Sequence, residues 1–483
     1  MFFAGCAVLV VGLAAANTPE ASVSQLFVDD ICVARKQGVL RRAHACSKLS
    51  EPVLIPEKPW EGNRVYVYGT VLPDAATNGF RMWYMSAGDT LAGTARDPKL
   101  GDQAKNHVLY ATSADGIRWD RPELNLFSFG GNPHTNIVFD FHSPSIVFNA
   151  NQSDPEMRYV MFGRSKGGKK SGYTTATSSD GLHWTPNPNE PVLDGGDTCT
   201  LTLDPKTGEY LAFFKKSHDY RGFSRRLVYL STSRDLQTWS APVLVMAPDE
   251  IDDAQTKAED GICSHFYNMA AFPYGGQYLG FVTHFRYRGE PAEKGPEQSG
   301  QDGPIDVQLV HSRDGRVWKR CEDRSPVIPN GPYEYDAGCI LGTANMPVAV
   351  GDELWVYYTA INTTHGGYTP KKRVTIARAA WPLDRFVSLD AEEEGIVETH
   401  SFLSPGSSLV VNADASTGSL AIEVLDGEGK VLKGYGASEC EVMNEDSLRR
   451  AVQWKGGSEL PKGAEIRLRF VLKHASLYSY TIR

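Results

Sequence analysis

The sequence predicts an all-β protein in which a five-bladed β-propeller is followed by a small C-terminal β-sandwich. Three observations predict this fold: a turn motif that recurs four times, short strand-like runs that recur in a fixed order around it, and a change of pattern after residue 402. The expected parts are a leader over residues 1–17, the propeller with an N-terminal strand segment over residues 18–402, and the sandwich over residues 403–483.

The first residues form a short apolar run that ends in small residues, "MFFAGCAVLVVGLAAANTPEAS". This pattern is typical of a secretory signal peptide cut near Ala14 to Asn17, although no Lys or Arg precedes the apolar run. A buried N-terminal strand is the alternative. No later apolar run is long enough to span a bilayer. We therefore expect a soluble, secreted or periplasmic protein with no membrane span.

The composition excludes several classes of function. The formal net charge of -9 leaves no basic surface of the kind that binds nucleic acid. The cysteines outside the leader are scattered and odd in number, and none form a CxxC pair. This argues against a zinc site and a disulfide framework, with one bridge between Cys32 and Cys46 left open. The sequence thus predicts no metal, no cofactor and no nucleic-acid partner, and it leaves the oligomeric state open.

The recurring turn consists of Ser, a variable residue, Asp, and a Trp four residues after the Asp. We expect the Asp side chain to accept hydrogen bonds from the turn backbone, the following Gly to supply a positive φ, and the Trp to anchor the hairpin. Leu236 replaces the Gly in the third copy. The four copies are Ser113/Asp115/Trp119, Ser178/Asp180/Trp184, Ser233/Asp235/Trp239 and Ser312/Asp314/Trp318.

A strand-like run precedes each turn, and two further short runs precede that strand. They are rich in aromatic and β-branched residues, as strands prefer. A fifth set of runs ends in "VTIARAAWPLDRF" without the turn. Five self-similar units of about 55 to 80 residues indicate radial repetition of four-stranded blades over residues 52–402. Two unrelated β-sandwiches would leave the repeat unexplained.

After residue 402 the pattern changes to strict alternation of apolar and polar residues, in segments separated by turns such as "DGEGK". This period of two is typical of half-buried strands, and it predicts the small C-terminal sandwich.

Carboxylates recur just ahead of the first strand of each predicted blade. Since these innermost strands converge at one end of the channel, the carboxylates and nearby aromatic residues are expected to line a funnel. Glycoside cleavage needs one carboxylic acid and one carboxylate, and aromatic rings suit sugar stacking. Ordinary loop chemistry is the alternative for each residue taken singly. The candidates are Glu61, Asp140 with His142, Asp194 with Asp197, Glu259 with Asp260, and Glu334 with Asp336.

At this point the chain resembles the five-bladed glycoside hydrolases of families 32 and 43 and, more closely, exported bacterial proteins described as family 32-like. "PVLIPEKPWEGNRVYVYG" followed by "FRMWYMS" is similar to their first blade. The family 32-like pattern is carried by "LFVDD" at Leu26–Asp30, "PWE" at Pro59–Glu61, the repeated turns, "LRF" at Leu468–Phe470 and "LYSY" at Leu477–Tyr480.

The resemblance implies catalytic roles for three carboxylates. Glu61 matches the first-blade nucleophile or base, Asp140 the carboxylate that orients the substrate, and Asp197 the position of the general acid. The well-defined families use Asp in the first of these positions and Glu in the third, and the invertase motifs "NDPNG", "RDP" and "EC" are absent from the expected places, so we do not expect fructan hydrolysis. An acid on the fourth blade, Glu259 or Asp260, is the alternative. The expected substrate-binding residues are Trp60, Asp260, His265, Tyr267 and Asp336.

The sequence therefore predicts an exported glycosidase that cleaves an oligo- or polysaccharide with a pair of funnel carboxylates. A non-catalytic carbohydrate-binding propeller is the first alternative, and a lyase that uses His265 and Tyr267 is the second. Arg164, Lys215 and Arg286 follow second strands and could bind an acidic sugar, but solvated rim charge is the simpler interpretation.

Overall fold

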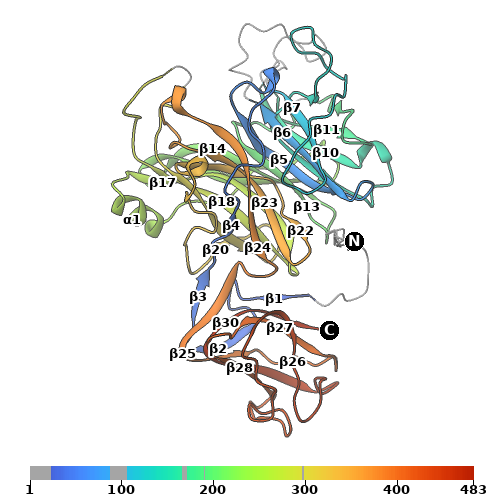
Figure 1. Ribbon diagram of the computed structural model, residues 1–483, viewed down its shortest axis with the longest axis vertical. Coiled ribbons are helices and arrows are strands. Elements are labelled where there is room, and N and C mark those ends of the chain that lie inside the picture. The colour runs from blue at the N-terminus through green and yellow to red at the C-terminus, as the bar shows by residue number, and fades with distance from the viewer. Residues whose placement is uncertain (1–22, 87–105, 166–170, 190, 296–297) are drawn as a thin grey trace, which may run out of the picture.

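The computed structural model describes residues 23–86, 106–165, 171–189, 191–295 and 298–483. Strands make up 51% of the described residues and helices 5%, which confirms the predicted all-β class. A larger unit lies above a smaller one built mainly from the C-terminal strands (Figure 1). The predicted leader, residues 1–17, lies outside the described residues.

The larger unit contains four antiparallel meanders in which each strand pairs with the next. The first three are separate four-stranded sheets. The fourth meander is the first part of a nine-stranded sheet, and we call its two parts the fourth and fifth sheets. The first sheet contains β5 (Val65–Asp74), β6 (Gly79–Ser86), β7 (Val108–Ser113) and β8 (Ile137–Phe139). The second contains β9 (His142–Phe148), β10 (Tyr159–Ser165), β11 (Gly172–Ser178) and β12 (Thr185–Pro186). The third contains β13 (Cys199–Leu203), β14 (Tyr210–Tyr220), β15 (Phe223–Ser233) and β16 (Val243–Met246). The fourth contains β17 (Cys263–Tyr274), β18 (Gln277–Tyr287), β19 (Ile305–Ser312) and β20 (Trp318–Arg320).

A fifth group of strands combines both ends of the larger unit. Its outer strand comes from the N-terminal part of the chain, because β4 pairs with β24. One parallel pair, Ile305 with Cys339, joins this group to the fourth sheet. The strands are β21 (Cys339–Thr343), β22 (Val348–Val350), β23 (Glu353–Ile361), β24 (Val374–Pro382) and β4 (Ser47–Lys48).

The five sheets pack on one another in a fixed order. Each consecutive pair of sheets shares a cluster of buried apolar side chains, and a further cluster joins the fifth sheet to the first. The first strands also lie next to one another in chain order, from β5 through β9, β13 and β17 to β21, and β21 contacts β5. The N-terminal ends of these five strands therefore lie close together.

The repeated turns have the predicted chemistry. Asp115 Oδ1 accepts hydrogen bonds from the backbone N–H groups of Ile117 and Arg118, both at 2.8 Å. The Ser113 hydroxyl donates to this carboxylate and accepts from the N–H of Gly116 at 2.8 Å. The same bonds recur at the other three turns. In the third turn Leu236 adopts the positive φ of 63° that the glycines adopt elsewhere.

Each turn also packs against the preceding sheet. In the second turn the Trp83 indole of the first sheet donates to the Gly181 carbonyl at 2.7 Å. A Cβ on Gly181 would lie 2.6 Å from the Trp83 ring, so the turn needs a glycine for this close approach as well as for its φ of 79°. Ring contacts connect the other turns to their neighbours: Trp119 with Tyr357, Trp239 with Phe162, and Trp318 with Phe213.

The smaller unit is one nine-stranded sheet that surrounds a single apolar core. The long strand β30 connects its parts, since it pairs with β1, β25, β26, β27 and β28. The strand pairing differs from the division expected at residue 402, because strands on both sides of that residue share β30 and β25. The strands are β25 (Val387–Thr399), β26 (Phe402–Leu403), β27 (Leu409–Asp414), β28 (Ser419–Asp426), β29 (Asp446–Ala451), β30 (Glu465–Ile482), β1 (Gln25–Leu26), β2 (Val33–Gln37) and β3 (Leu40–Ala43).

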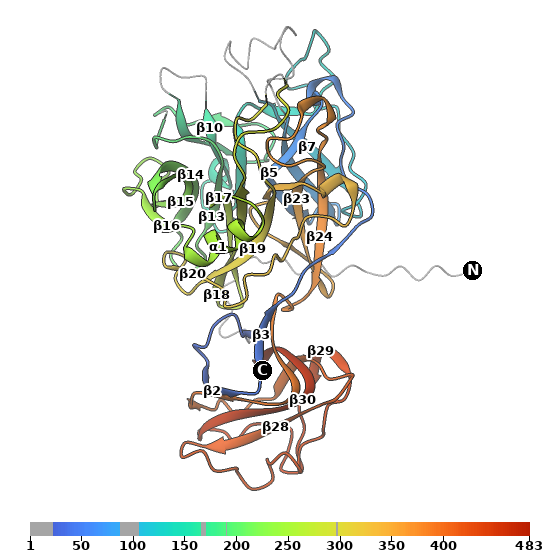
Figure 2. The same cartoon turned by 90° about the vertical axis from the view of Figure 1, so that its left-hand side faces the viewer.

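One α-helix, α1 (Glu250–Ala258), occurs in the described part of the chain, between the third and fourth sheets (Figure 2). The Asp249 carboxylate caps it by accepting the N–H groups of Ile251 and Asp252, and Arg324 binds the same carboxylate at 2.6 Å. Short 3₁₀ helices cover Pro59–Glu61, Pro155–Met157, Glu334–Asp336 and Thr369–Lys371.

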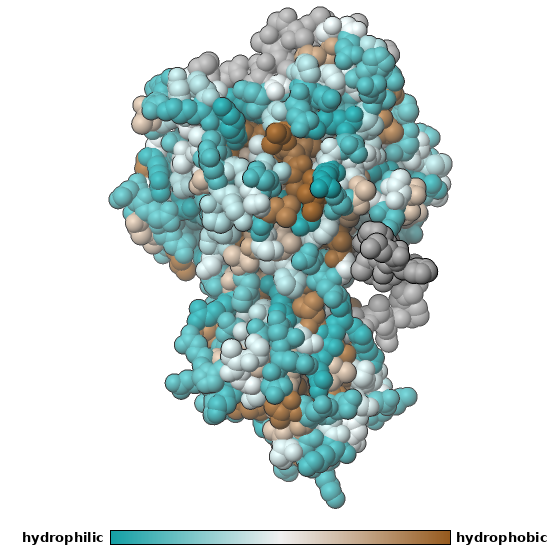
Figure 3. Space-filling view, in the orientation of Figure 1, coloured by the Kyte–Doolittle hydropathy of each residue, from teal (hydrophilic) through white to brown (hydrophobic). Residues whose placement is uncertain are grey.

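Among the described residues, no helix combines the length and apolarity that a bilayer crossing requires. The visible surface is mainly hydrophilic, with an apolar patch near the middle of the larger unit (Figure 3). The seven cysteines in the described ranges are free thiols, including Cys32 and Cys46.

We expect Asp180→Ala to lower the free energy of unfolding by about 1 kcal/mol at pH 7, because it removes the acceptor for two backbone N–H groups. Burial opposes ionisation of this carboxyl, but the hydrogen bonds from His183 and Leu182 lower its pKa to about 2. Because the pKa is lower in the folded than in the unfolded protein, the ionised carboxylate stabilises the fold at pH values above its ordinary pKa. This stabilisation is lost as the pH falls through the folded-state value. The difference between variant and parent should thus shrink between about pH 4 and pH 2.

Urea unfolding followed by tryptophan fluorescence measures both effects. Asp219→Ala is the matched control, because Asp219 is exposed on the β14–β15 hairpin. Equal stability of Asp180→Ala and the parent at pH 7 would contradict the role of this turn.

Candidate active site

The N-terminal ends of the first strands bring together a group of polar and aromatic side chains around Asp197. We call this group the Asp197 cluster. Asp197 lies two residues ahead of β13, in a loop whose close approach to Tyr173 depends on glycine: a Cβ on Gly195 would lie 1.7 Å from the Tyr173 ring. The Tyr173 hydroxyl accepts the N–H of Asp197 at 3.1 Å and fixes the loop. The members of the cluster are Asp197, His142, Arg164, Lys215, Arg226, Tyr66, Tyr68, Tyr267 and His365.

Asp197 is paired with a buried lysine. Its Oδ2 lies 2.6 Å from Nζ of Lys215, and its Oδ1 lies 3.4 Å from Nε2 of His142. Burial would raise the pKa of Asp197, but the charge of Lys215 and the nearby His142 outweigh that effect and hold it well below its usual range. Asp197 is therefore a carboxylate at neutral pH. Its side chain keeps 36% of its surface exposed, which leaves room for a ligand.

Aromatic rings form the wall of the cluster. Nζ of Lys215 lies 3.9 Å from the centre of the Tyr267 ring, and the Arg226 guanidinium lies over the same ring at 5.1 Å. Tyr66 and Tyr68 stack with their planes 5° apart and their centroids 5.6 Å apart. Cations over aromatic faces are stabilised when desolvated, so the rings hold both cations in place.

His365 of the cluster and His265 beside it are neutral at physiological pH. Burial, followed by the positive charge of Arg226, lowers the pKa of His265 to about 3. His365 is affected in the same way, again with burial as the main cause, and its pKa is also about 3. His265 Nδ1 lies 3.2 Å from a terminal nitrogen of Arg226, so this ring nitrogen is not available to a substrate proton. This occupancy disfavours the lyase alternative.

Asp140 lies in the short connection between β8 and β9, the first strand of the second sheet. It precedes His142 by two residues, and its Oδ1 accepts the N–H of Asn106 at 3.1 Å. His142 begins β9 and contacts Asp197 directly. The structure thus places two of the three predicted catalytic carboxylates two residues ahead of adjacent inner strands, β9 and β13.

Glu61 lies elsewhere. Its side chain is completely buried, and both of its oxygens are used by the protein. Oε2 accepts the backbone N–H groups of Glu57 and Lys58, at 2.7 and 2.9 Å. Oε1 accepts the Tyr84 hydroxyl and Nε of Arg121, both at 2.6 Å. A carboxylate with this set of partners holds a loop together and has no free oxygen for a sugar.

Trp60 is buried beside Glu61 between the first and fifth sheets. Its indole donates to Asn136 Oδ1 at 2.6 Å, and its ring lies against Phe129. The structure therefore does not place Trp60 with the Asp197 cluster.

The other predicted substrate-binding residues divide into three groups. Tyr267 lies in the Asp197 cluster, and His265 lies directly beside it. Asp260 is exposed in the turn after α1, with a φ of 61°. Asp336 is buried and binds Nζ of Lys48 at 2.6 Å, so it attaches β4 to the fifth sheet.

Two of the basic residues expected to be solvated rim charges, Lys215 and Arg286, are largely buried. Lys215 is not a solvated rim charge: its side chain is only 8% exposed. Arg286 is also largely buried and pairs with Asp306 and Glu259. The available signal was the position of Arg164 near the end of β10, and of Lys215 in β14 one residue past Phe214, which pairs with the first residue of β13.

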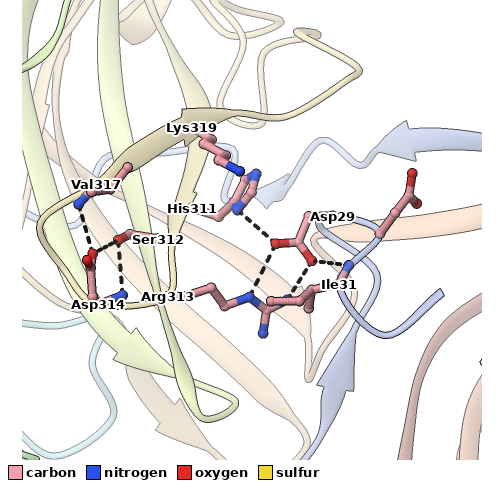
Figure 4. A pocket seen from close by; sticks show the side chains of 9 residues that line it. Asp29, Ile31, His311, Ser312, Arg313, Asp314, Val317 and Lys319 are labelled. Carbon is pink, nitrogen blue, oxygen red and sulfur yellow. Dashed lines mark hydrogen bonds and ion pairs between the residues drawn. The ribbon is translucent and has the colours of Figure 1, made fainter. Parts of the chain in front are cut away.

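A separate pocket of about 460 Å³ lies where the N-terminal segment meets the fourth turn (Figure 4). Asp29 binds Arg313 at 2.5 Å and lies 3.5 Å from Nδ1 of His311. Asp29 also accepts the N–H of Ile31, as expected for a turn. These contacts attach the N-terminal segment to the larger unit. Within the described ranges, no group of three or more His, Cys, Asp or Glu residues is placed to bind a metal ion.

No protein-family model matches the chain, and no curated protein matches it. Solved structures do resemble it. A glycosyl hydrolase from Bacteroides ovatus has a TM-score of 0.44 at 13% identity, over 71% of this chain and 95% of that one. An N-acetylgalactosamine deacetylase from F. plautii, in complex with blood group B trisaccharide, has a TM-score of 0.43 at 14% identity, over 72% and 97%.

A third similar structure is described under the GH130 family of mannoside phosphorylases and glycoside hydrolases. Its TM-score is 0.36 at 13% identity, over 75% of this chain and 96% of that one. Similarity at this level is distant, so the function proposed below depends on the geometry of the Asp197 cluster.

We expect Glu61→Gln to lower the free energy of unfolding by about 3 kcal/mol or more, because it leaves Arg121 without its buried carboxylate. Glu57→Gln is the matched control. Glu57 contacts the same Arg121 at 3.1 Å, but its side chain is 55% exposed, so its removal should cost less than about 1 kcal/mol. Chemical denaturation of both variants measures the difference. Equal stabilities would contradict a structural role for Glu61.

Proposed function

We propose that the protein is an exported glycoside hydrolase that cleaves an oligo- or polysaccharide at the Asp197 cluster. In this proposal the five sheets are the blades of a closed five-bladed propeller, and the cluster lies in its funnel. The cyclic order of contacts from β5 to β21 and back to β5 supports the closed arrangement. The shared core between the fifth and first sheets supports it as well.

One observation carries the proposal: an ionised, partly exposed carboxylate is fixed between a buried lysine and a histidine, against a wall of tyrosines. A glycosidase needs a carboxylate that stays ionised to act as nucleophile or to activate water, and a second group that carries a proton. The depressed pKa of Asp197 suits the first role and disfavours the general-acid role that the family resemblance implied.

Asp140 is our candidate for the proton donor. It lies in the connection between β8 and β9, two residues before His142, and His142 contacts Asp197. In the proposed reaction Asp140 gives its proton to the leaving glycosidic oxygen. Asp197 either removes a proton from the water that attacks the anomeric carbon, or attacks that carbon itself. In the second case the deprotonated Asp140 then takes a proton from a water molecule, which displaces Asp197 and releases the sugar. Because the roles are assigned from this chain's own geometry, the proposal concerns the glycoside hydrolase class and is not tied to families 32 or 43.

A non-catalytic carbohydrate-binding propeller is the second candidate. The observation that favours it is the tight pairing of Asp197 with Lys215, whose positive charge compensates that of the carboxylate, while Tyr66 and Tyr68 offer a stacked aromatic surface. A binding protein would retain saccharides on this surface without releasing new reducing ends.

We expect Asp197→Asn to reduce hydrolysis by about 10²- to 10⁴-fold, because the variant lacks the ionised oxygen. Release of reducing ends from a panel of plant, algal and microbial polysaccharides measures it. Asp219→Asn makes the same chemical change at an exposed site on β14, and its activity should equal that of the parent. Asp140→Asn should be impaired to a similar degree, with partial rescue on substrates whose leaving group needs no proton.

Thermal unfolding shows whether each variant remains folded at the assay temperature. Full activity of a folded Asp197→Asn variant would remove Asp197 from the mechanism. Saccharide binding without any release of reducing ends by the parent protein would favour the binding module.

A further inference from the structure

The Asp197 cluster contains more positive than negative charge. Arg164, Lys215 and Arg226 come from β10, β14 and β15, and Asp197 is the only carboxylate of the described residues that forms an ion pair with any of them. Elsewhere among the described residues, no carboxylate lies within ion-pair distance of Arg164 or Arg226. His265 and His365 are neutral, so they do not alter this count. With Asp140 included, three cations still face two carboxylates.

The two arginines are held in position by uncharged groups. The Arg226 guanidinium lies over the rings of Tyr267 and Phe285, at 5.1 and 5.2 Å, and one of its terminal nitrogens faces His265 Nδ1. Arg164 donates to the Ser171 hydroxyl at 2.9 and 3.2 Å. These contacts fix the direction of each guanidinium and leave its charge uncompensated.

The three cations are close enough to affect one another. Burial is the main cause that lowers the pKa of Lys215, and the charges of Arg226 and Arg164 lower it further. Mutual repulsion between cations destabilises the fold unless an anion relieves it. Such an arrangement is typical of a binding site for an oxyanion, because the planar fork of arginine matches a carboxylate or a sulfate.

A further arginine, Arg64, lies just ahead of the first inner strand. It immediately precedes β5, and it lies two residues before Tyr66, on the same face of an extended chain. Its Nε and one terminal nitrogen are buried without a hydrogen-bond partner in the part of the chain that the structure describes.

We propose that this basic wall binds the anionic group of an acidic sugar, a ring carboxylate or a sulfate ester, and so places the adjacent glycosidic bond at Asp197. The proposal rests on the proposed function, since it names the class of substrate for the same site. Arg226 and Arg164 would bind the anion, and Lys215 would be shared between the anion and Asp197. Tyr66 and Tyr68 would offer the stacking surface for the neighbouring sugar.

Binding measurements on the Asp197→Asn protein test the proposal without requiring turnover. The probes are matched pairs: oligogalacturonate and its methyl ester, oligomannuronate and manno-oligosaccharide, and a κ-carrageenan oligosaccharide and its desulfated form. Isothermal titration calorimetry should give at least tenfold tighter binding for the acidic member of one pair. A difference in affinity within either uronate pair would identify a ring carboxylate as the bound group, and a difference within the carrageenan pair would identify a sulfate ester. The affinity for the preferred acidic probe should fall as the salt concentration rises.

Arg226→Gln and Arg164→Gln should each weaken binding of the preferred acidic probe by about tenfold or more, and leave binding of its neutral partner unchanged. Arg234→Gln is the matched control, because Arg234 is exposed in the third turn and pairs with Glu209. Arg226→Lys should recover part of the lost affinity, since it restores the charge without the fork. Thermal unfolding of each variant verifies its fold.

Two results would overturn the proposal: neutral and acidic members that bind equally well in all three pairs, or folded arginine variants with unchanged affinity for the acidic probe. Failure of the proposed function has a different outcome. In that case the parent protein binds the acidic probe through the arginines and releases no reducing ends from it.

Discussion

The docking of each Asp-containing turn onto the preceding sheet is the contact on which the larger unit depends. A four-stranded sheet buries neither of its faces alone, and the turn fixes how far and at what angle the next sheet approaches. The turn does so with a backbone carbonyl or a tryptophan ring that reaches the neighbour's middle strand, as at Gly181 and Trp83 or at Trp318 and Phe213. The sheet spacing set in this way determines where the five first strands begin.

The candidate site follows from that placement. Side chains that are remote in sequence meet only because the strand ends converge: Lys215 of the third sheet contacts Asp197 of its own sheet and Tyr267 of the next. A lysine in such a position loses much of its hydration, and the carboxylate and the ring replace it. Burial opposes the ionisation of Asp197, and the charge of Lys215 overcomes it, whereas burial is the main reason that His265 stays neutral. The site thus combines a fixed negative charge with an excess of fixed positive charges within one small volume.

Local chemistry could be predicted from the sequence, and distant partnerships could not. The Ser-Asp-Gly-Trp turns follow from hydrogen bonds between residues two or three apart, and the strand pattern follows from the alternation of apolar side chains. Asp197 and Tyr267 could be found because their positions ahead of, or early in, inner strands are visible in the sequence. Glu61 has an equivalent position, but its carboxylate is bonded by Arg121 and Tyr84. Neither of these long-range contacts can be read from the residues around Glu61 in the sequence. The burial of Lys215 depends on its contact with Tyr267, and a contact between residues so far apart in sequence leaves no trace in the local pattern.

The N-terminal strands join the beginning of the chain to its end. β1 pairs with β30, β3 with β25, and β4 with β24, so the strands within residues 25–48 have their strand partners in the last quarter of the sequence. A chain that emerges from the ribosome N-terminus first must keep these strands unpaired until their partners, β24, β25 and β30, have been made. Contacts over such long sequence separations form slowly. The early strands therefore wait for about 300 residues or more of intervening chain before either unit gains its last strand.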